Sequence, residues 1–89
     1  MEKDIVVNGK SFKIRELLAI EVDNLEFPRE TDTEEVKKAK FNELAKKQIM
    51  CSANLSEEEV AKLTWKERNE IMGTINEING FSVFQKPTN

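Results

Sequence analysis

The sequence contains no histidine, no tyrosine and only one cysteine, Cys51. Without histidine it lacks the commonest general base of enzymes and the commonest neutral metal ligand. One cysteine can form neither an intramolecular disulfide nor, without histidine, a thiol–imidazole pair, and it fits a reducing compartment. The glycines are too far apart for a phosphate-binding loop: they are Gly9, Gly73 and Gly80. We therefore expect no catalytic residue, no cofactor and no enzymatic activity.

We also expect no basic surface, no membrane span and no secretory signal. The net charge is −3, whereas nucleic acids and anionic membranes attract positively charged surfaces. No apolar run approaches the ~20 residues that span a membrane, and the start MEKDIVVNGK does not have the order of a secretory signal. The acidic run at residues 57–59 has no glycine bend and no alternating oxygens, so we expect no metal site. These features predict a cytoplasmic protein that binds neither nucleic acid nor membranes.

The sequence does contain enough apolar residues for one small core. Hydrophobic residues make up 38% and charged residues 35% of the 89 positions, so we expect one domain of marginal stability. Asn8-Gly9 is the strongest short hairpin signal, because both residues of the favoured turn need a positive φ. With residues 5–7 before it and 10–14 after it, this pair predicts a β-hairpin over about residues 4–14.

Four helices are predicted after the hairpin. Apolar residues at helical spacing, bounded by capping and stop signals, place them over about residues 15–26, 33–52, 57–63 and 65–79. The first is expected to end at Phe27, because Pro28 disfavours a helical conformation in the residue before it. The second is expected to begin with the side chain of Asp32 as its N-cap. We expect a single domain over residues 1–89 with a mobile tail at 85–89, in the α+β class: mainly α, with an N-terminal β-hairpin packed on three to four helices.

The stretch LTWKERNEIMGTINEING, residues 63–80, contains a helix start signal, an apolar stripe and a stop signal. Thr64 with Glu67 three residues later predicts the start, and Gly80 predicts a left-handed C-cap. Gly73 lies between them, on the side away from the isoleucines, where glycine costs ~1 kcal/mol relative to alanine. Either another element or a partner lies close to the backbone at Gly73, or the cost is tolerated.

Aromatic and methionine side chains near the C-terminal end are candidates for binding a partner, because both types are enriched at the centres of protein interfaces. The predicted partner-binding residues are Trp65, Met72, Phe81 and Phe84. Packing in the core is the alternative for each of them. A free outer edge of the hairpin would also allow self-association with a second copy.

Two stretches, in their order along the chain, carry a family resemblance. A hairpin containing VNGKSFKIREL leads to two helices, and LSEEEVAKLTWKERNEIMGTINEINGF then forms a helix corner and a final helix. From Ile5 to Phe81 this order resembles the small tail assembly chaperones of long-tailed bacteriophages. The resemblance implies a non-enzymatic protein that binds the tape-measure protein, keeps its helices soluble and helps to recruit tail-tube subunits. It also implies a location in the cytoplasm of the host bacterium, and in many such proteins a longer form made by ribosomal frameshifting.

Two other functions stay open on the residues alone. The helices predicted at 57–63 and 65–79 meet at a tight corner, as in a helix-turn-helix regulator, and Lys62, Lys66 and Arg68 could reach phosphates. Glutamates outnumber these bases in the same stretch, which gives the wrong field for nucleic acid. The other function is that of an acidic phage inhibitor that binds a host enzyme.

Overall fold

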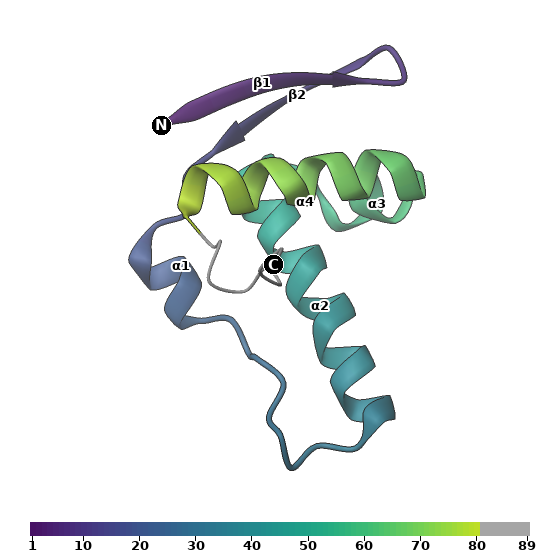
Figure 1. Ribbon diagram of the computed structural model, residues 1–89. Helices are drawn as coiled ribbons and strands as arrows, with labels where there is room; N and C mark the ends of the chain where they lie inside the picture. Colours follow the sequence, from purple (N-terminus) through teal and green to yellow (C-terminus); the bar gives the residue numbers. More distant parts are fainter. Residues whose placement is uncertain (81–89) are drawn as a thin grey trace, which may run out of the picture.

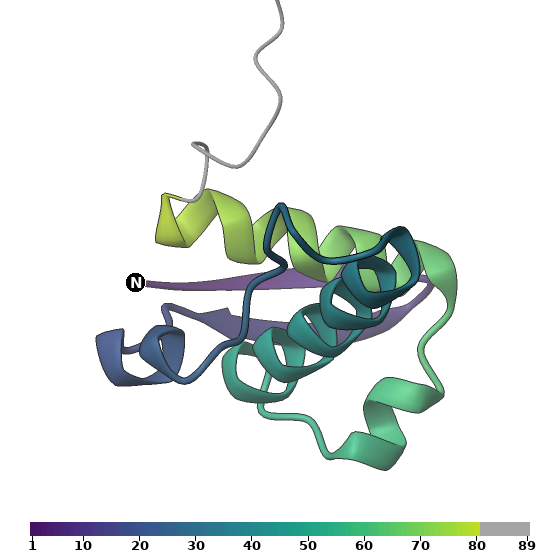
Figure 2. The ribbon, with the colours of Figure 1, turned by 90° about the horizontal axis from the view of Figure 1, so that it is seen from below.

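The computed structural model describes residues 1–80, so the tail predicted at 85–89 lies outside the described part. The fold is α+β and mainly α, with an antiparallel hairpin followed by helices. In chain order the elements are β1 (Glu2–Val7), β2 (Lys10–Arg15), α1 (Ala19–Asp23), α2 (Glu34–Ser52), α3 (Glu57–Ala61) and α4 (Trp65–Asn79). The hairpin lies along α4, and α2 runs from this pair away from the hairpin (Figure 1). Seen along α2, α1 and α3 lie at opposite ends of the fold (Figure 2).

The hairpin forms because its turn residues accept positive φ angles, 53° at Asn8 and 79° at Gly9. Val7 pairs with Lys10 across this turn and Ile5 pairs with Phe12, so these side chains share one face. That face packs on α4. The predicted hairpin is confirmed, and its first strand begins at Glu2, two residues earlier than expected.

The core lies where the hairpin, α4 and the C-terminal half of α2 meet. Its fully buried side chains include four isoleucines, one from β2, one from α2 and two from α4: Ile14, Ile49, Ile71 and Ile75. Val60 attaches the short α3 to the same cluster. Ion pairs join the hairpin to both ends of α4, with Lys3 Nζ 2.7 Å from Glu77 Oε1 and Lys10 Nζ 3.4 Å from Glu67 Oε2.

The capping signals before α3 and α4 are confirmed. Ser56 accepts a hydrogen bond from the backbone N–H of Glu59, and the Glu59 carboxylate accepts one from the N–H of Ser56. Thr64 and Glu67 form the same reciprocal pair, so α4 begins at Trp65 as predicted. It ends at Asn79 with Gly80 in the left-handed conformation, φ 68°. The short α3 ends at residue 61, two residues before the predicted end.

The helix predicted over 15–26 is present but its bounds are wrong, because only Ala19–Asp23 is helical. Strand pairing continues through the end of β2, where the N–H of Glu16 donates to the carbonyl of Met1 at 3.0 Å. The helix then begins late, at the point where the Glu21 carboxylate accepts a hydrogen bond from the N–H of Leu18. Pairing of Glu16 with Met1, at the open end of the hairpin, therefore prevents the helix from starting at residue 15, although the apolar residues between 14 and 25 have helical spacing.

The N-cap predicted at Asp32 is also wrong by one residue. Thr33 is the N-cap of α2, and its Oγ1 accepts a hydrogen bond from the N–H of Val36 at 3.2 Å. The Asp32 carboxylate instead accepts hydrogen bonds from the N–H of Arg29 and from Lys40 Nζ. Lys40, about two turns into the helix, thus draws the Asp32 carboxylate away from the cap position, and the neighbouring Thr33 hydroxyl replaces it.

Gly73 lies on the exposed side of α4, and within residues 1–80 no atom outside the adjoining turns of its own helix would come within 4 Å of a Cβ added there. Close approach of another element of the described chain is therefore excluded. A partner at this position and a tolerated cost stay as the two interpretations.

Candidate partner-binding groove

The N-terminal half of α2 extends beyond the core. Figure 1 shows this half below the hairpin and α4, with residues 24–33, here called the connecting segment, descending from α1 to its lower end. Its apolar residues are poorly covered, since Val36 is 40% exposed and Phe41 is 58% exposed. Burying large apolar side chains is favourable. Another chain segment can therefore stabilise this half of α2 by covering it.

An apolar groove of about 400 Å³ lies between the middle of α2, the connecting segment and α4. It is lined by residues from α1, the connecting segment, α2 and α4: Val22, Phe27, Phe41, Leu44, Ala45, Gln48, Met72 and Asn76. All of these except Gln48 and Asn76 have apolar side chains. A concave, mostly apolar surface with a few polar groups is typical of binding sites in proteins.

Gln48 provides the polar group within this apolar groove. The residue is only 5% exposed, and its Oε1 accepts no hydrogen bond from any residue in the described part of the chain. A buried amide oxygen without a donor costs ~1–3 kcal/mol, so such atoms are normally paired. A ligand that carries an N–H or O–H group into the apolar groove would satisfy this oxygen.

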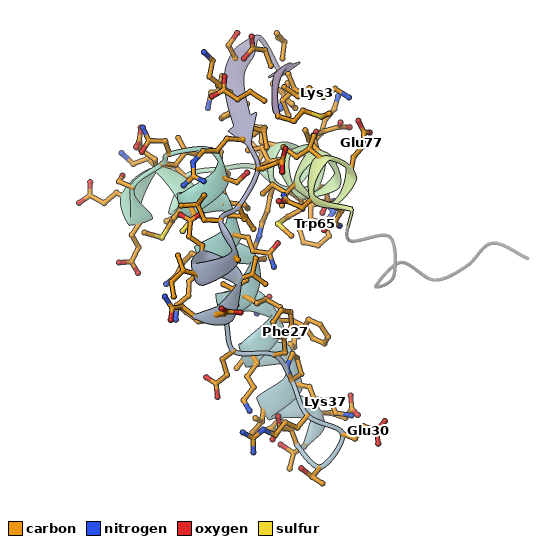
Figure 3. All side chains as sticks on the ribbon, turned by 90° about the vertical axis from the view of Figure 1, so that its left-hand side faces the viewer. Lys3, Phe27, Glu30, Lys37, Trp65 and Glu77 are labelled. Carbon is orange, nitrogen blue, oxygen red and sulfur yellow. The ribbon has the colours of Figure 1, made fainter. Side chains whose placement is uncertain are left out.

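Of the four predicted partner-binding residues, the structure brings one into the apolar groove. Met72 lines it from the middle of α4. Trp65 is 75% exposed and is not one of the lining residues, although it lies two turns before Met72 on the same side of the helix. In Figure 3, Trp65 and Phe27 point to the same side of the molecule. Phe81 and Phe84 lie outside the described residues.

Phe41 and Phe27 line the apolar groove but were not among the predicted partner-binding residues. Phe41 lies one turn before Ala45 and two turns before Gln48, which puts all three on one face of α2, so its position was readable from helical spacing. For Phe27 no comparable signal exists, because the connecting segment has no regular structure that fixes a direction.

A carboxylate–lysine cluster ties the connecting segment to α2. Lys40 Nζ lies 2.8 Å from Asp32 Oδ2 and 3.6 Å from Glu26 Oε2. The hydrogen bond from Lys40 lowers the pKa of Asp32, and the same bond raises the pKa of Lys40. Both groups therefore stay charged at neutral pH, and the connecting segment is held at a fixed distance from α2 as one wall of the apolar groove.

A second electrostatic contact places α1 at the other end of the connecting segment. The Arg15 guanidinium donates hydrogen bonds of 3.0 and 2.8 Å to the two carboxylate oxygens of Glu21. Mainly because of Arg15, and also because of the N–H of Leu18, the pKa of Glu21 falls to about 2. Burial raises the pKa of the neighbouring Cys51 thiol, so this cysteine is protonated at neutral pH and is a poor nucleophile.

The basic residues of the helix-turn-helix alternative are only partly available. Lys62 and Lys66 are exposed, but the guanidinium of Arg68 is directed at the carbonyl of Asn42 on α2, 3.5 Å away. A role as a nucleic-acid-binding regulator therefore stays an untested alternative. Among residues 1–80 no cluster of acidic or cysteine side chains has the size needed to hold a metal ion, and no helix there has the length and hydropathy of a membrane span.

Comparisons of the chain with models of protein families, with curated proteins and with solved structures found no match. A binding site is therefore supported by the geometry of the apolar groove alone, and the likeness to tail assembly chaperones remains a resemblance seen in the sequence.

Proposed function

We propose that this chain is a non-enzymatic tail assembly chaperone, which binds the tape-measure protein and helps to recruit tail-tube subunits. The observation that supports this role is the apolar groove, with Phe41 more than half exposed on its α2 wall. The resemblance to tail assembly chaperones gives the partner, and the apolar groove gives a place where a partner's helix can bind.

The chemistry of the apolar groove suits an amphipathic helix. Such a helix binds by laying its apolar side chains, spaced three or four residues apart, into a groove of this kind. Covering an exposed phenylalanine such as Phe41 contributes ~1.5–3 kcal/mol at most, and part of that is lost to the ordering of both partners. A complex held by a few such contacts dissociates readily, as a chaperone that releases its partner requires.

Co-expression with the tape-measure protein tests this function. We expect the unmodified chain to keep the tape-measure protein soluble, and we expect Phe41→Glu to lose this effect, because a charge would lie in the apolar groove. Ile20→Glu is the matched control, since Ile20 is 61% exposed on α1 and does not line the apolar groove. It should behave as the unmodified chain does.

Two outcomes would contradict the proposal. One is a tape-measure protein that is equally insoluble with and without this chain. The other is tight, salt-sensitive retention of duplex DNA in a gel shift, which would favour the helix-turn-helix regulator. Capture of a host enzyme from infected cells, without any tail protein, would favour the inhibitor.

A further inference from the structure

The end of α4 is held beside the apolar groove. Asn79 Oδ1 accepts a hydrogen bond from the N–H of Leu17, and Asn79 Nδ2 donates one to the carbonyl of Ile75, both at 2.8 Å. Asn76, on the wall of the apolar groove, lies four residues before Gly80, which is about 6 Å along the helix axis. The point at which the chain leaves α4 is therefore fixed about one helical turn from this wall.

The residues that follow α4 match the chemistry of the apolar groove. The sequence continues as FSVF and then QKPTN, so the apolar part comes first, directly after Gly80. Four extended residues reach at most ~14 Å, which is enough to extend from the end of α4 along Asn76 and Met72. A tether this short keeps the segment at a high effective concentration beside the apolar groove, so even weak contacts would hold it there.

Gln48 adds a polar requirement that the same segment can meet. Its unpaired Oε1 needs a donor, and an extended segment offers main-chain N–H groups between its side chains. Ser82 also offers a hydroxyl between the aromatic residues. We infer that residues 81–84 of this chain occupy the apolar groove in the unbound protein, with aromatic side chains on its apolar walls and a donor on Gln48 Oε1.

Occupation by the chain's own segment would regulate the same site. This step rests on the proposed function, because a partner helix and residues 81–84 would then compete for the apolar groove. The affinity for the partner falls by the fraction of molecules in which the site is open, so a segment bound nine times out of ten weakens it about tenfold. Release of the segment would thus set when the partner can bind.

Nuclear Overhauser effects on the full chain test the occupation itself, whether or not a partner exists. We expect contacts from the ring protons of Phe81 and Phe84 to the methyl groups of Ala45 and Met72. A sample that mixes differently labelled chains distinguishes contacts within one chain from contacts between two copies. If the contacts occur only between differently labelled chains, the segment of a second copy occupies the apolar groove. If neither ring contacts Ala45 or Met72 at all, the segment lies elsewhere. Either result overturns the inference.

Affinity for the tape-measure protein tests the competition. We expect the full chain with Phe81→Ser and Phe84→Ser to bind about 3- to 10-fold more tightly than the unmodified chain. Gln85→Ala, just beyond the apolar part, is the control and should leave the affinity unchanged. Unchanged or weaker binding of the double variant would overturn the competition, and weaker binding would assign both rings to the partner interface. If no form of the chain binds the tape-measure protein, the proposed function fails, while the Overhauser contacts still decide the occupation.

Discussion

The two halves of α2 differ in what surrounds them, although they form one continuous helix. The C-terminal half carries the fully buried Ile49 and the buried Leu44, and it packs against α4. The N-terminal half carries Val36 and Phe41, which are 40% and 58% exposed. One half is thus stabilised by the core, and the other is held by its cap and by the connecting segment.

This difference follows from the size of the molecule. A chain of 89 residues buries a smaller share of its surface than a larger domain does, and its single core lies where the hairpin, α4 and the C-terminal half of α2 meet. Isolated helical turns are marginal in water without tertiary packing. The N-terminal half therefore depends on Thr33 and on the Asp32–Lys40 contact, and its apolar residues stay available to a further segment.

The largest effect should come from removing core packing at the buried half. We expect Ile49→Ala to lower the free energy of unfolding by ~2–5 kcal/mol, because it leaves a cavity among fully buried isoleucines. Val36→Ala, in the exposed half of the same helix, should lower it by less than ~0.5 kcal/mol. Urea denaturation of both variants measures the difference, and similar losses would show that the two halves are equally packed.

A smaller effect is expected from the N-cap of the exposed half. Thr33→Ala removes the acceptor of the Val36 N–H and should lower the free energy of unfolding by ~1 kcal/mol. Hydrogen exchange should become faster over the first turns of α2 and stay unchanged around Ile49. Thr31→Ala, at an exposed position two residues earlier, is the control. Should both variants exchange alike, the cap would not be what holds this half.

The elements whose determinants lie close together in the chain were predictable from the sequence. The turn at Asn8-Gly9, the capping pairs at Ser56 and Thr64, and the C-cap at Gly80 each depend on residues no more than four positions apart. Local signals of this kind determine the ends of α4, and its predicted range agrees with the structure.

The two largest failures involve partners that lie far apart in the chain. The helix predicted over 15–26 begins late because backbone pairing between Glu16 and Met1 extends the hairpin. The apolar groove needs the connecting segment, α2 and α4 in a fixed arrangement, which no spacing within one element reveals. Met72 was predicted because methionine is common in interfaces, whereas Phe27 had no signal at all.

Low pH should weaken the contact between β2 and α1 near the buried half of α2. The pKa of Glu21 is lowered from its ordinary 4.5 to about 2, mainly by Arg15, so its ionised form stabilises the fold above pH 4.5. This contribution is lost as the pH falls from about 4.5 towards 2. We expect the stability of Glu21→Gln to fall less over this range than that of the unmodified chain, by a modest amount because solvent screens the partly exposed pair. Equal pH dependence, measured by urea denaturation at several pH values, would contradict this role.

The smallest effect is expected for Phe41 when residues 81–84 cannot cover it, and it tests whether the chain itself covers this side chain. With Phe81→Ser and Phe84→Ser already present, Phe41→Ser should change the free energy of unfolding by less than ~0.5 kcal/mol, because the ring is 58% exposed. With residues 81–84 intact, the same substitution should cost more, since it would also remove their contact in the apolar groove. The difference between the two costs is a coupling energy, for which contacting residues typically give ~0.5–3 kcal/mol. A coupling of zero would mean that the exposed half of α2 stays uncovered until a partner binds, and the contrast between the two halves would then be a property of the free protein in solution.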